Sequence, residues 1–302
     1  MKRMRIHLYT VSWNEAKILP FFFRHYDRFV DRYVFFDDGS DDETVRMLKA
    51  HPRVDVRQLE RKFDSYLLSA TYVRNTAWKQ SRGRADWVIA TDVDEHLYHT
   101  DIVPYLERRA AEGVTMIPAL GYQMLTPHFP NADSLLCRDH TMGAPFRPMN
   151  KVGIFNPDAI EETNFQPGRH FAQPTGHVRY PDQDELLNLH YKYLSTDFIS
   201  DRLARLVSKI GTADADRPAL ANWDVNDEQI QRWIAIWKAA SIDVTDRDAA
   251  TPERHRDPLD PRWRQSPPYW RTRPWQVRWW WMRLPQKTRT AAWRIRKLTG
   301  LS

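Results

Sequence analysis

Residues 86–96 read DWVIATDVDEH, a short apolar run that ends abruptly in acidic side chains. The apolar part, residues 87–90, has the composition of a buried strand. Asp92, Asp94 and Glu95 follow at once, so the strand delivers carboxylates at its C-terminal end, where open α/β sheets bind ligands. Two carboxylates spaced i and i+2 can hold one divalent cation, and such a cation can clamp a diphosphate. This stretch therefore predicts a buried strand with a candidate metal site at its end.

Strand-like and helix-like segments alternate along the first hundred residues. The apolar spacing predicts strands over 5–11, 32–36, 54–58 and 87–91, and helices over 15–29, 42–50 and 69–80. This alternation predicts right-handed βαβ units. We therefore expect an α/β fold with a mostly parallel sheet flanked by helices.

The rest of the chain divides into three further kinds of segment. Residues 114–180 are irregular and rich in Pro, Gly, His and aromatic residues, which predicts long loops around a binding site. A late strand is expected over 186–191, helices over 197–210 and 227–240, and a linker or poorly ordered loop over 243–268. These patterns predict a catalytic domain over 1–195, a helical extension over 196–242, and a linker with a basic tail over 243–302.

The composition is ordinary for a soluble globular protein, with 42% hydrophobic and 28% charged residues among 302. The chain has no uncharged apolar run of the roughly 18 residues that a membrane-spanning helix requires. Its opening apolar stretch is too short and too interrupted for a signal peptide. Cys137 is the only cysteine, which excludes an intrachain disulfide and fits a reducing compartment. A cytoplasmic location is the expectation.

The residues from Pro261 onward form a strongly cationic tail. They hold eleven of the 45 Lys and Arg residues, none of the 39 Asp and Glu residues, and seven of the 13 tryptophans. Tryptophan favours the lipid headgroup region, and basic side chains are attracted to anionic lipid. The segment from Trp263 to Lys297 is therefore predicted to attach to an anionic membrane surface, peripherally at its inner face. The alternative is a C-terminal helix that packs its tryptophans on the body; nucleic-acid binding is disfavoured because no recognised fold surrounds the segment.

A second motif, YVFFDDGSDDET over residues 33–44, is another apolar strand that runs into acids. A carboxylate at such a strand end, here Asp37, can accept the imide N–H of a uracil base. The alternative is purely structural: a tight turn with Ser40 as a helix N-cap and Glu43 closing a capping box.

A third motif, VSWNE over residues 11–15, forms the first strand-to-helix turn. Its backbone N–H groups and polar side chains can bind a nucleoside or a phosphate at the N-terminus of a helix. Ser12 and Glu15 also satisfy a capping box, which requires no ligand.

Together, VSWNEAKILPFFFRHY, FFDDGSDDET and DWVIATDVDEHL resemble the ordered motifs of the glycosyltransferase family 2 superfamily, nucleotide-sugar-dependent enzymes of the GT-A fold. The resemblance covers about residues 4–100 and continues weakly to LLNLHYKYLSTDF over residues 186–198. The second motif follows the D-x-G-S-x-D-x-T pattern of the family through Asp37, Gly39, Ser40, Asp42 and Thr44.

The resemblance implies a Rossmann-like GT-A domain with a helical C-terminal extension, and it implies a role for particular residues. Asp92 and Asp94 would bind Mn²⁺ or Mg²⁺, with His190 as a further ligand and with Glu95 completing the catalytic acids. The nucleotide pocket would be lined by Val11, Asn14, Glu15, Asp37 and Arg74, with Asp37 reading the base. For Arg74 the alternative is a solvated helix face, and for His190 a packed or hydrogen-bonded ring.

The expected reaction is transfer of a sugar from a nucleotide-sugar donor, with a UDP-sugar favoured, to a surface polysaccharide or a glycolipid acceptor, either a glycan or a lipid-linked glycan. An inverting transferase needs a carboxylate as general base. The candidates stay open among Asp158, Glu161, Glu162, Asp182, Asp184 and Glu185, and so does the choice between inverting and retaining transfer.

Two other functions compete with this interpretation. A nucleotidyltransferase or other phosphate-transfer enzyme would share the acidic strand end, but VSWNEAKIL lacks the glycines of a phosphate loop. The chain could also be a non-catalytic membrane- or nucleic-acid-binding adaptor with a degenerate GT-A fold.

Overall fold

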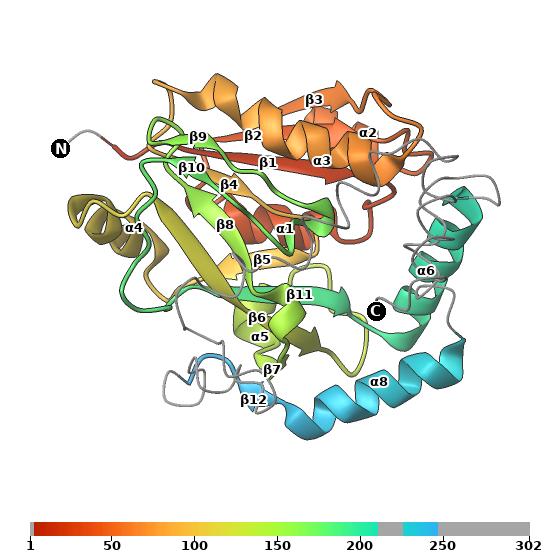
Figure 1. Cartoon of the computed structure of the whole chain (residues 1–302). Coiled ribbons are helices and arrows are strands. Elements are labelled where there is room, and N and C mark those ends of the chain that lie inside the picture. The colour runs from red at the N-terminus through yellow and green to blue at the C-terminus, as the bar shows by residue number, and fades with distance from the viewer. Residues whose placement is uncertain (1–2, 211–225, 247–302) are drawn as a thin grey trace, which may run out of the picture.

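A computed structural model describes residues 3–210 and 226–246 (Figure 1). The predicted membrane-binding segment from Trp263 to Lys297 lies outside the described residues, as does all but the beginning of the predicted linker. Among the described residues, no helix is long and apolar enough to cross a membrane.

The first half of the main sheet is parallel, as the alternating pattern predicts. Its strands run in the order β4-β1-β2-β3. They are β1 (Ile6–Ser12), β2 (Arg32–Asp37), β3 (Val54–Gln58) and β4 (Trp87–Ala90), and they are connected through α1 (Leu19–Tyr26), α2 (Thr44–Ala50), α3 (Tyr66–Thr76) and the 3₁₀ turn η1 (Ala77–Ser81). The predicted α/β fold with helices flanking the sheet is confirmed.

Alternate residues of these strands belong to two separate hydrophobic cores, because successive side chains of a strand point to opposite faces. One face of β1 and β4 carries Leu8 and Ile89, which pack against α1 and α4 (Ile102–Ala111). The other face carries Val11 and Ala90, which pack against α3 and η1. In Figure 1, α3 lies in front of the sheet and α1 behind it.

The expectation of long loops over residues 114–180 is wrong in part, because three strands of this region extend the sheet, whereas residues 156–180 form only short elements. The ten residues of β6 (Met116–Leu125) pair with β8 (Lys151–Phe155), β7 (Met142–Pro145) and β11 (Leu187–Tyr193). In this second half of the sheet, beyond β4, neighbouring strands are antiparallel, except that β6 and β11 are parallel. The remaining elements are β5 (Glu95–Tyr98), α5 (Leu136–Asp139), η2 (Arg147–Met149), η3 (Pro167–Arg169) and the small pair β9 (Ile160–Glu162) and β10 (Thr175–Gly176).

Two features explain why β6 does not look like a strand in the sequence. Pro118 lies where the pairing with β8 shifts register, a position that tolerates the missing N–H group. Gly121 lies so close to η2 that a Cβ atom built there would be 2.3 Å from the carbonyl carbon of Met149. Nine of the ten β6 residues are buried, so the strand also lacks the alternation of a half-exposed one.

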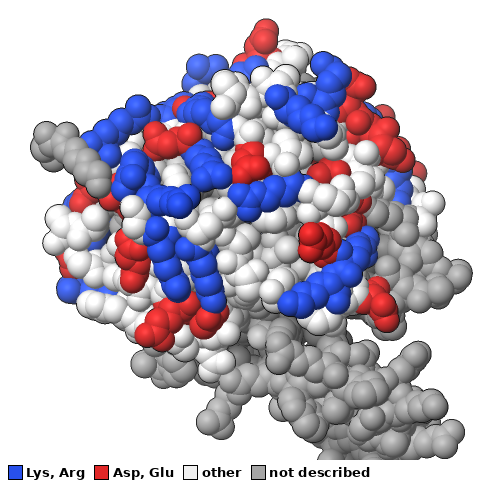
Figure 2. Space-filling view, turned by 90° about the horizontal axis from the view of Figure 1, so that it is seen from above, with Lys and Arg blue, Asp and Glu red and all other residues white. Residues whose placement is uncertain are grey.

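The helical segment after β11 packs against β11, β6 and β7. It contains α6 (Thr196–Ile210) and α8 (Asp227–Ala240), and the short β12 (Ile242–Asp243) then pairs with β7. Ile199 and Leu203 of α6 and Ile230 of α8 are buried together with Tyr193. Seen from above, basic and acidic side chains are intermixed on the surface (Figure 2). The division into a domain over 1–195 and an extension over 196–242 stays a prediction.

Candidate functional site

The three sequence motifs meet at one edge of the sheet. Ser12 at the end of β1 pairs with Asp37 at the end of β2, and Tyr9 pairs with Ala90 at the end of β4. The acids that follow β4 therefore lie beside the first two motifs, because parallel strands end at the same edge. From the other half of the sheet, β11 brings His190 opposite Glu95 and Gln123.

Hydrogen bonds join the first two motifs into one loop structure. The backbone N–H of Asn14 donates to Ser40 Oγ (2.9 Å) and that of Glu15 to Thr44 Oγ1 (2.7 Å). The Asn14 side chain is also bonded to Asp41 in both directions. These N–H groups donate to side chains of the second motif, and their binding to a nucleoside or a phosphate stays a prediction.

Both predicted capping boxes are wrong. The first helix, α1, begins at Leu19, four residues after the predicted start, and has no side-chain cap. Ser12 Oγ is buried with no hydrogen-bond partner among the described residues. Ser40 lies before α2 and binds Asn14, while Asp42 accepts the N–H of Thr44 (2.9 Å). The polar residues in the loops after β1 and β2 thus hold the first two motifs together and do not cap the helices.

Asp37 is held in place by its own turn. Its Oδ2 accepts the N–H groups of Gly39 (3.0 Å) and Ser40 (2.9 Å), and its Oδ1 accepts the Ser40 hydroxyl (2.6 Å). Gly39 has a φ of 73°, which favours glycine there. An ionised carboxylate accepts about four hydrogen bonds, so Asp37 retains capacity for a ligand N–H.

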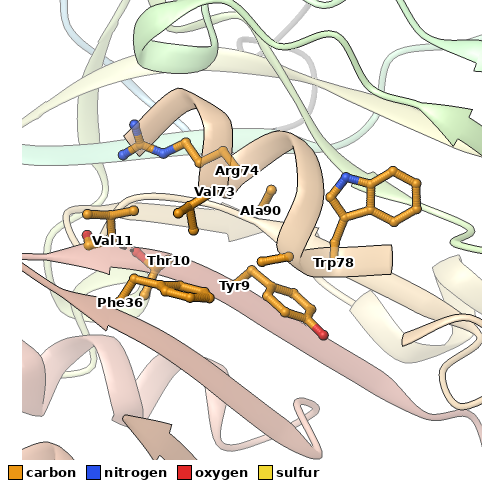
Figure 3. A pocket seen from close by; sticks show the side chains of 9 residues that line it. Tyr9, Thr10, Val11, Phe36, Val73, Arg74, Trp78 and Ala90 are labelled. Carbon is orange, nitrogen blue, oxygen red and sulfur yellow. Dashed lines mark hydrogen bonds between the residues drawn. The ribbon is translucent and has the colours of Figure 1, made fainter. Parts of the chain in front are cut away.

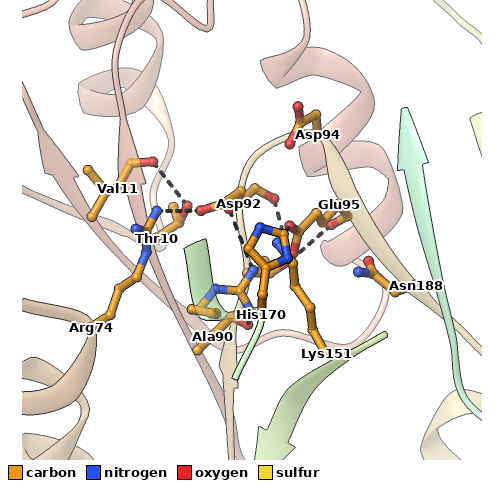
Figure 4. A network of polar contacts seen from close by, with 12 residues as sticks. Thr10, Val11, Arg74, Ala90, Asp92, Asp94, Glu95, Lys151, His170 and Asn188 are labelled. Carbon is orange, nitrogen blue, oxygen red and sulfur yellow. Dashed lines mark hydrogen bonds and ion pairs between the residues drawn. The ribbon is translucent and has the colours of Figure 1, made fainter. Parts of the chain in front are cut away.

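Asp92 is paired with a basic side chain from α3. Arg74 Nη2 donates to Asp92 Oδ1 (2.5 Å), and the buried Arg169 lies 3.7 Å from Oδ2. Burial alone would raise the pKa of Asp92, but Arg74, Arg169 and Lys151 outweigh it and hold that pKa well below its usual range. Arg74, predicted to line the nucleotide pocket, therefore neutralises Asp92. Figure 4 shows Asp92 beside Arg74, with Asp94 standing apart from this pair.

Asp94 is paired with Arg202 of α6 and faces His190. Arg202 Nη1 lies 3.0 Å from Asp94 Oδ2, and Arg202 Nη2 lies 2.8 Å from Glu15 Oε1. Against the effect of burial, Arg202 and His190 lower the pKa of Asp94 well below its usual value. Burial raises the pKa of Glu15 to about 8, with Arg202 opposing the shift and Asp94 adding to it. One arginine thus bridges an acid of the first motif and an acid of the third.

The neighbours of His190 fix which ring nitrogen faces Asp94. The Gln123 amide nitrogen donates to the His190 carbonyl (3.1 Å), so the amide oxygen faces His190 Nδ1 (2.9 Å), which must carry the hydrogen. The ring therefore turns Nε2 towards Asp94 Oδ2, 3.5 Å away. A histidine whose other ring nitrogen donates to such an outer partner is usual in metal sites, so His190 Nε2 and the Asp94 carboxylate are placed to share a cation.

Glu95 belongs to a fully buried group that Arg169 connects to Asp92. It is paired with Lys151 of β8 (2.6 Å) and with Arg169, whose other terminal nitrogen donates to the Ala90 carbonyl (2.7 Å). All three charged side chains are less than 5% exposed. Sequence reasoning missed Lys151, Arg169 and Arg202, because nothing in their local patterns indicates the distant acids that they contact.

The predicted metal ligands do not all lie in one cluster. In the part of the chain that the structure describes, no group of three or more His, Cys, Asp or Glu side chains is arranged to hold a metal ion. Asp94 and His190 do face each other, and Mg²⁺ or Mn²⁺ commonly takes one or two protein ligands, with water and substrate phosphates completing the shell. The pair therefore fits a cation whose coordination a phosphate ligand completes.

A small pocket opens beside Arg74, between the ends of β1 and β2 and the helix α3 (Figure 3). Its walls are mainly apolar, with Val11, Phe36 and Val73 among them. Figure 3 shows the Arg74 guanidinium pointing away from these side chains. This pocket adjoins the Asp92 ion pair, and its free space of about 10 Å³ is no larger than one water molecule requires.

Several candidate general bases have partners away from this edge. Asp158 accepts the N–H of Gly83 (2.7 Å), just before β4 begins, and Glu162 is paired with Lys79 of η1. Glu185 is paired with Arg108 of α4 (3.1 Å). These contacts place them near the start of β4 or against α4, so the general base stays unassigned.

No family model matches the sequence, and no curated protein matches it. Among solved structures, the chain is similar to TarS of S. aureus, at 10% identity and a TM-score of 0.37, over 75% of this chain and 41% of that one. It is also similar to glucosyl-3-phosphoglycerate synthase from Mycobacterium tuberculosis, in complex with Mn²⁺, UDP and glucosyl-3-phosphoglycerate, at 20% identity and a TM-score of 0.28 over 39% and 44% of the two chains. A mycobacterial protein gives 18% identity and a TM-score of 0.34 over 54% and 57%. The chain thus spans less than half of TarS, and at these TM-scores the likeness supports no conclusion about activity.

Proposed function

We propose that this protein is a glycosyltransferase that moves a sugar from a nucleotide-sugar donor, with a UDP-sugar favoured, to a glycan or lipid-linked glycan acceptor. One observation carries the proposal: three motifs that resemble those of glycosyltransferase family 2 meet at one sheet edge, where Asp94 faces His190. The acids and the histidine come from segments about a hundred residues apart, so the sequence motifs alone do not imply their contact.

The charges of this edge suit a diphosphate. The acids Asp92, Asp94 and Glu15 are each within reach of a basic side chain, either Arg74 or Arg202. Asp94 and His190 would hold Mn²⁺ or Mg²⁺, and the bound cation supplies positive charge where the leaving diphosphate becomes more negative. An imidazole ligand favours Mn²⁺, since Mg²⁺ prefers oxygen. The base would lie near Asp37.

The competing nucleotidyltransferase interpretation loses support at the first loop. Such an enzyme would cradle phosphates with the backbone N–H groups after the first strand. Here the N–H groups of Asn14, Glu15 and Ala16 donate to side chains of the second motif.

The basic tail adds a proposal about location. We propose that the segment from Trp263 to Lys297 attaches the enzyme to an anionic membrane surface, which would bring it near a lipid-linked or surface acceptor.

Asp94→Asn tests the proposed function. We expect UDP with Mn²⁺ to raise the melting temperature of the wild type and to leave that of D94N unchanged. Hydrolysis of UDP-sugars, screened as a panel, should fall about 100-fold or more because the cation loses its anionic ligand. Asp101→Asn is the matched control, since Asp101 is exposed and its side chain caps no helix. Equal UDP binding and donor turnover by D94N and the wild type would sink the proposal, while binding without turnover in the wild type would favour the adaptor.

A further inference from the structure

Arg202 occupies a position that the sequence motifs do not reveal. It comes from α6, 108 residues after Asp94, and its guanidinium contacts both Asp94 Oδ2 and Glu15 Oε1. Its side chain is only 24% exposed, and both acids are more deeply buried. A guanidinium group is planar and presents several donors, so it can bridge two carboxylates where an ammonium group serves one.

Arg202 and the candidate cation compete for one oxygen. Asp94 Oδ2 is the atom that Arg202 contacts at 3.0 Å, and it is also the atom that faces His190 Nε2 at 3.5 Å. A cation bound between Asp94 and His190 would meet the positive charge of Arg202 at this oxygen. At such short distances two like charges repel strongly, so the arginine has to move away.

We propose that Arg202 is an internal counter-ion: it neutralises Asp94 while it hydrogen-bonds to Glu15, and a divalent cation displaces it from Asp94. The inference rests on the proposed function, because it takes Asp94 and His190 as the cation ligands. The displaced guanidinium remains at the sheet edge and becomes a partner for the diphosphate of the donor. Arg202 therefore couples the binding of the cation to that of the nucleotide.

The coupling follows from the free-energy cost of binding the cation without the nucleotide. A cation that binds alone must break the Arg202–Asp94 ion pair and weaken the pairing of the buried Glu15, which is unfavourable. A nucleoside diphosphate that binds together with the cation gives Arg202 a new anionic partner and offsets that cost. By thermodynamic linkage, UDP and Mn²⁺ should each raise the affinity of the other by the same factor.

The test measures Mn²⁺ binding to the full chain by electron paramagnetic resonance, with and without UDP. In Arg202→Gln we expect Mn²⁺ alone to bind about tenfold more tightly than in the wild type, because its competitor is gone. The factor by which UDP raises the Mn²⁺ affinity should fall by about tenfold or more. Arg202→Lys, which keeps the charge but cannot bridge both acids, should lie between the two and keeps the test valid if R202Q does not fold.

Arg205→Gln is the matched control. Arg205 is the next arginine on α6 and is paired with Asp201 of the same helix (3.0 Å), outside the contact with Asp94 and Glu15. It should bind Mn²⁺ as the wild type does, with the same effect of UDP.

The outcomes separate this inference from the proposed function. Unchanged or weaker Mn²⁺ binding by R202Q and R202K, with coupled Mn²⁺ and UDP binding retained in the wild type, would overturn the role of Arg202 alone. A wild type that binds no Mn²⁺ even with UDP would overturn both.

Discussion

At the scale of single residues, the candidate site depends on largely buried arginines, one of which has a strained backbone conformation. Arg169 has a φ of 57°, a left-handed conformation that costs about 1–3 kcal/mol and persists only where other contacts enforce it. Those contacts are the Ala90 carbonyl at the end of β4 and the carboxylate of Glu95. Asn14 of the first motif has a similar φ of 53°. Residues with left-handed backbone thus lie in the first motif and in contact with the third.

We expect Arg169→Met to destabilise the protein by about 3 kcal/mol, because it leaves the buried Glu95 with one fewer positive partner. Glu95→Gln should also destabilise, yet the double variant should lose at least about 1 kcal/mol less than the sum of the two. Urea unfolding of the four proteins measures this. Strictly additive losses would show that the two side chains are not energetically coupled.

The sequence predicted the acids of this site but not their partners. Asp37, Asp92 and Asp94 lie at or just after strand ends, and a local apolar run predicts both a strand and the residue at which it ends. Arg202 instead lies on the polar face of an amphipathic helix, where a solvated arginine is the ordinary expectation. Its contact with Asp94 depends on how α6 packs after β11, which no local pattern specifies.

At the scale of elements, α1 and β5 meet through two stacked histidines. The rings of His25 and His96 are 4.6 Å apart and nearly parallel, and both side chains are buried. Burial lowers the pKa of His25 to about 4, and burial together with His25 holds that of His96 well below its usual range. Both rings are therefore neutral in the folded protein at pH 7 and stay so in mild acid.

This pair predicts a loss of stability in mild acid. The unfolded chain takes up protons on both rings below about pH 6.5, and the folded protein does not, so the free energy of unfolding falls as the pH falls. Each ring contributes about 2 kcal/mol of this loss between pH 7 and pH 5. We expect His96→Phe to remove that share while keeping the aromatic contact, as urea unfolding at the two pH values would measure. The exposed His128, changed to Gln, is the control; a pH dependence in H96F equal to that of the wild type would contradict the assignment.

Helices and strands could be predicted where the local pattern of apolar residues matched their burial in the structure. β1, β2, β3 and β4 are each within about one residue of the predicted strands, because an apolar run between polar turns is sufficient to define them. The start of α1 was misplaced because the N–H groups of Asn14, Glu15 and Ala16 donate to the second motif, and the regular helix begins only at Leu19. Pro20 then lies in the first turn of α1, where proline is tolerated.

At the scale of the whole molecule, charge is divided between a mildly acidic body and a cationic, tryptophan-rich tail. On the face of the described body that Figure 2 shows, basic groups lie beside acidic ones. Intermixed charges of this kind attract an anionic surface weakly, whereas a run of basic residues without acids attracts it by about 1 kcal/mol per residue. The tail after Pro261, which lies outside the described residues, is therefore the part expected to bind anionic lipid.

We expect deletion of residues 261–302 to lower binding to vesicles of anionic lipid by about 100-fold or more, as sedimentation at low salt would measure. Raising the salt concentration should release the full chain as well, because the attraction between exposed charges is screened. The melting temperature with UDP and Mn²⁺ should respond equally in both proteins, since the residues proposed to bind these ligands all lie before residue 203. Vesicles of neutral lipid provide the control. Equal sedimentation of the full and shortened chains with anionic vesicles would assign the tail to packing on the body and leave the donor site unaffected.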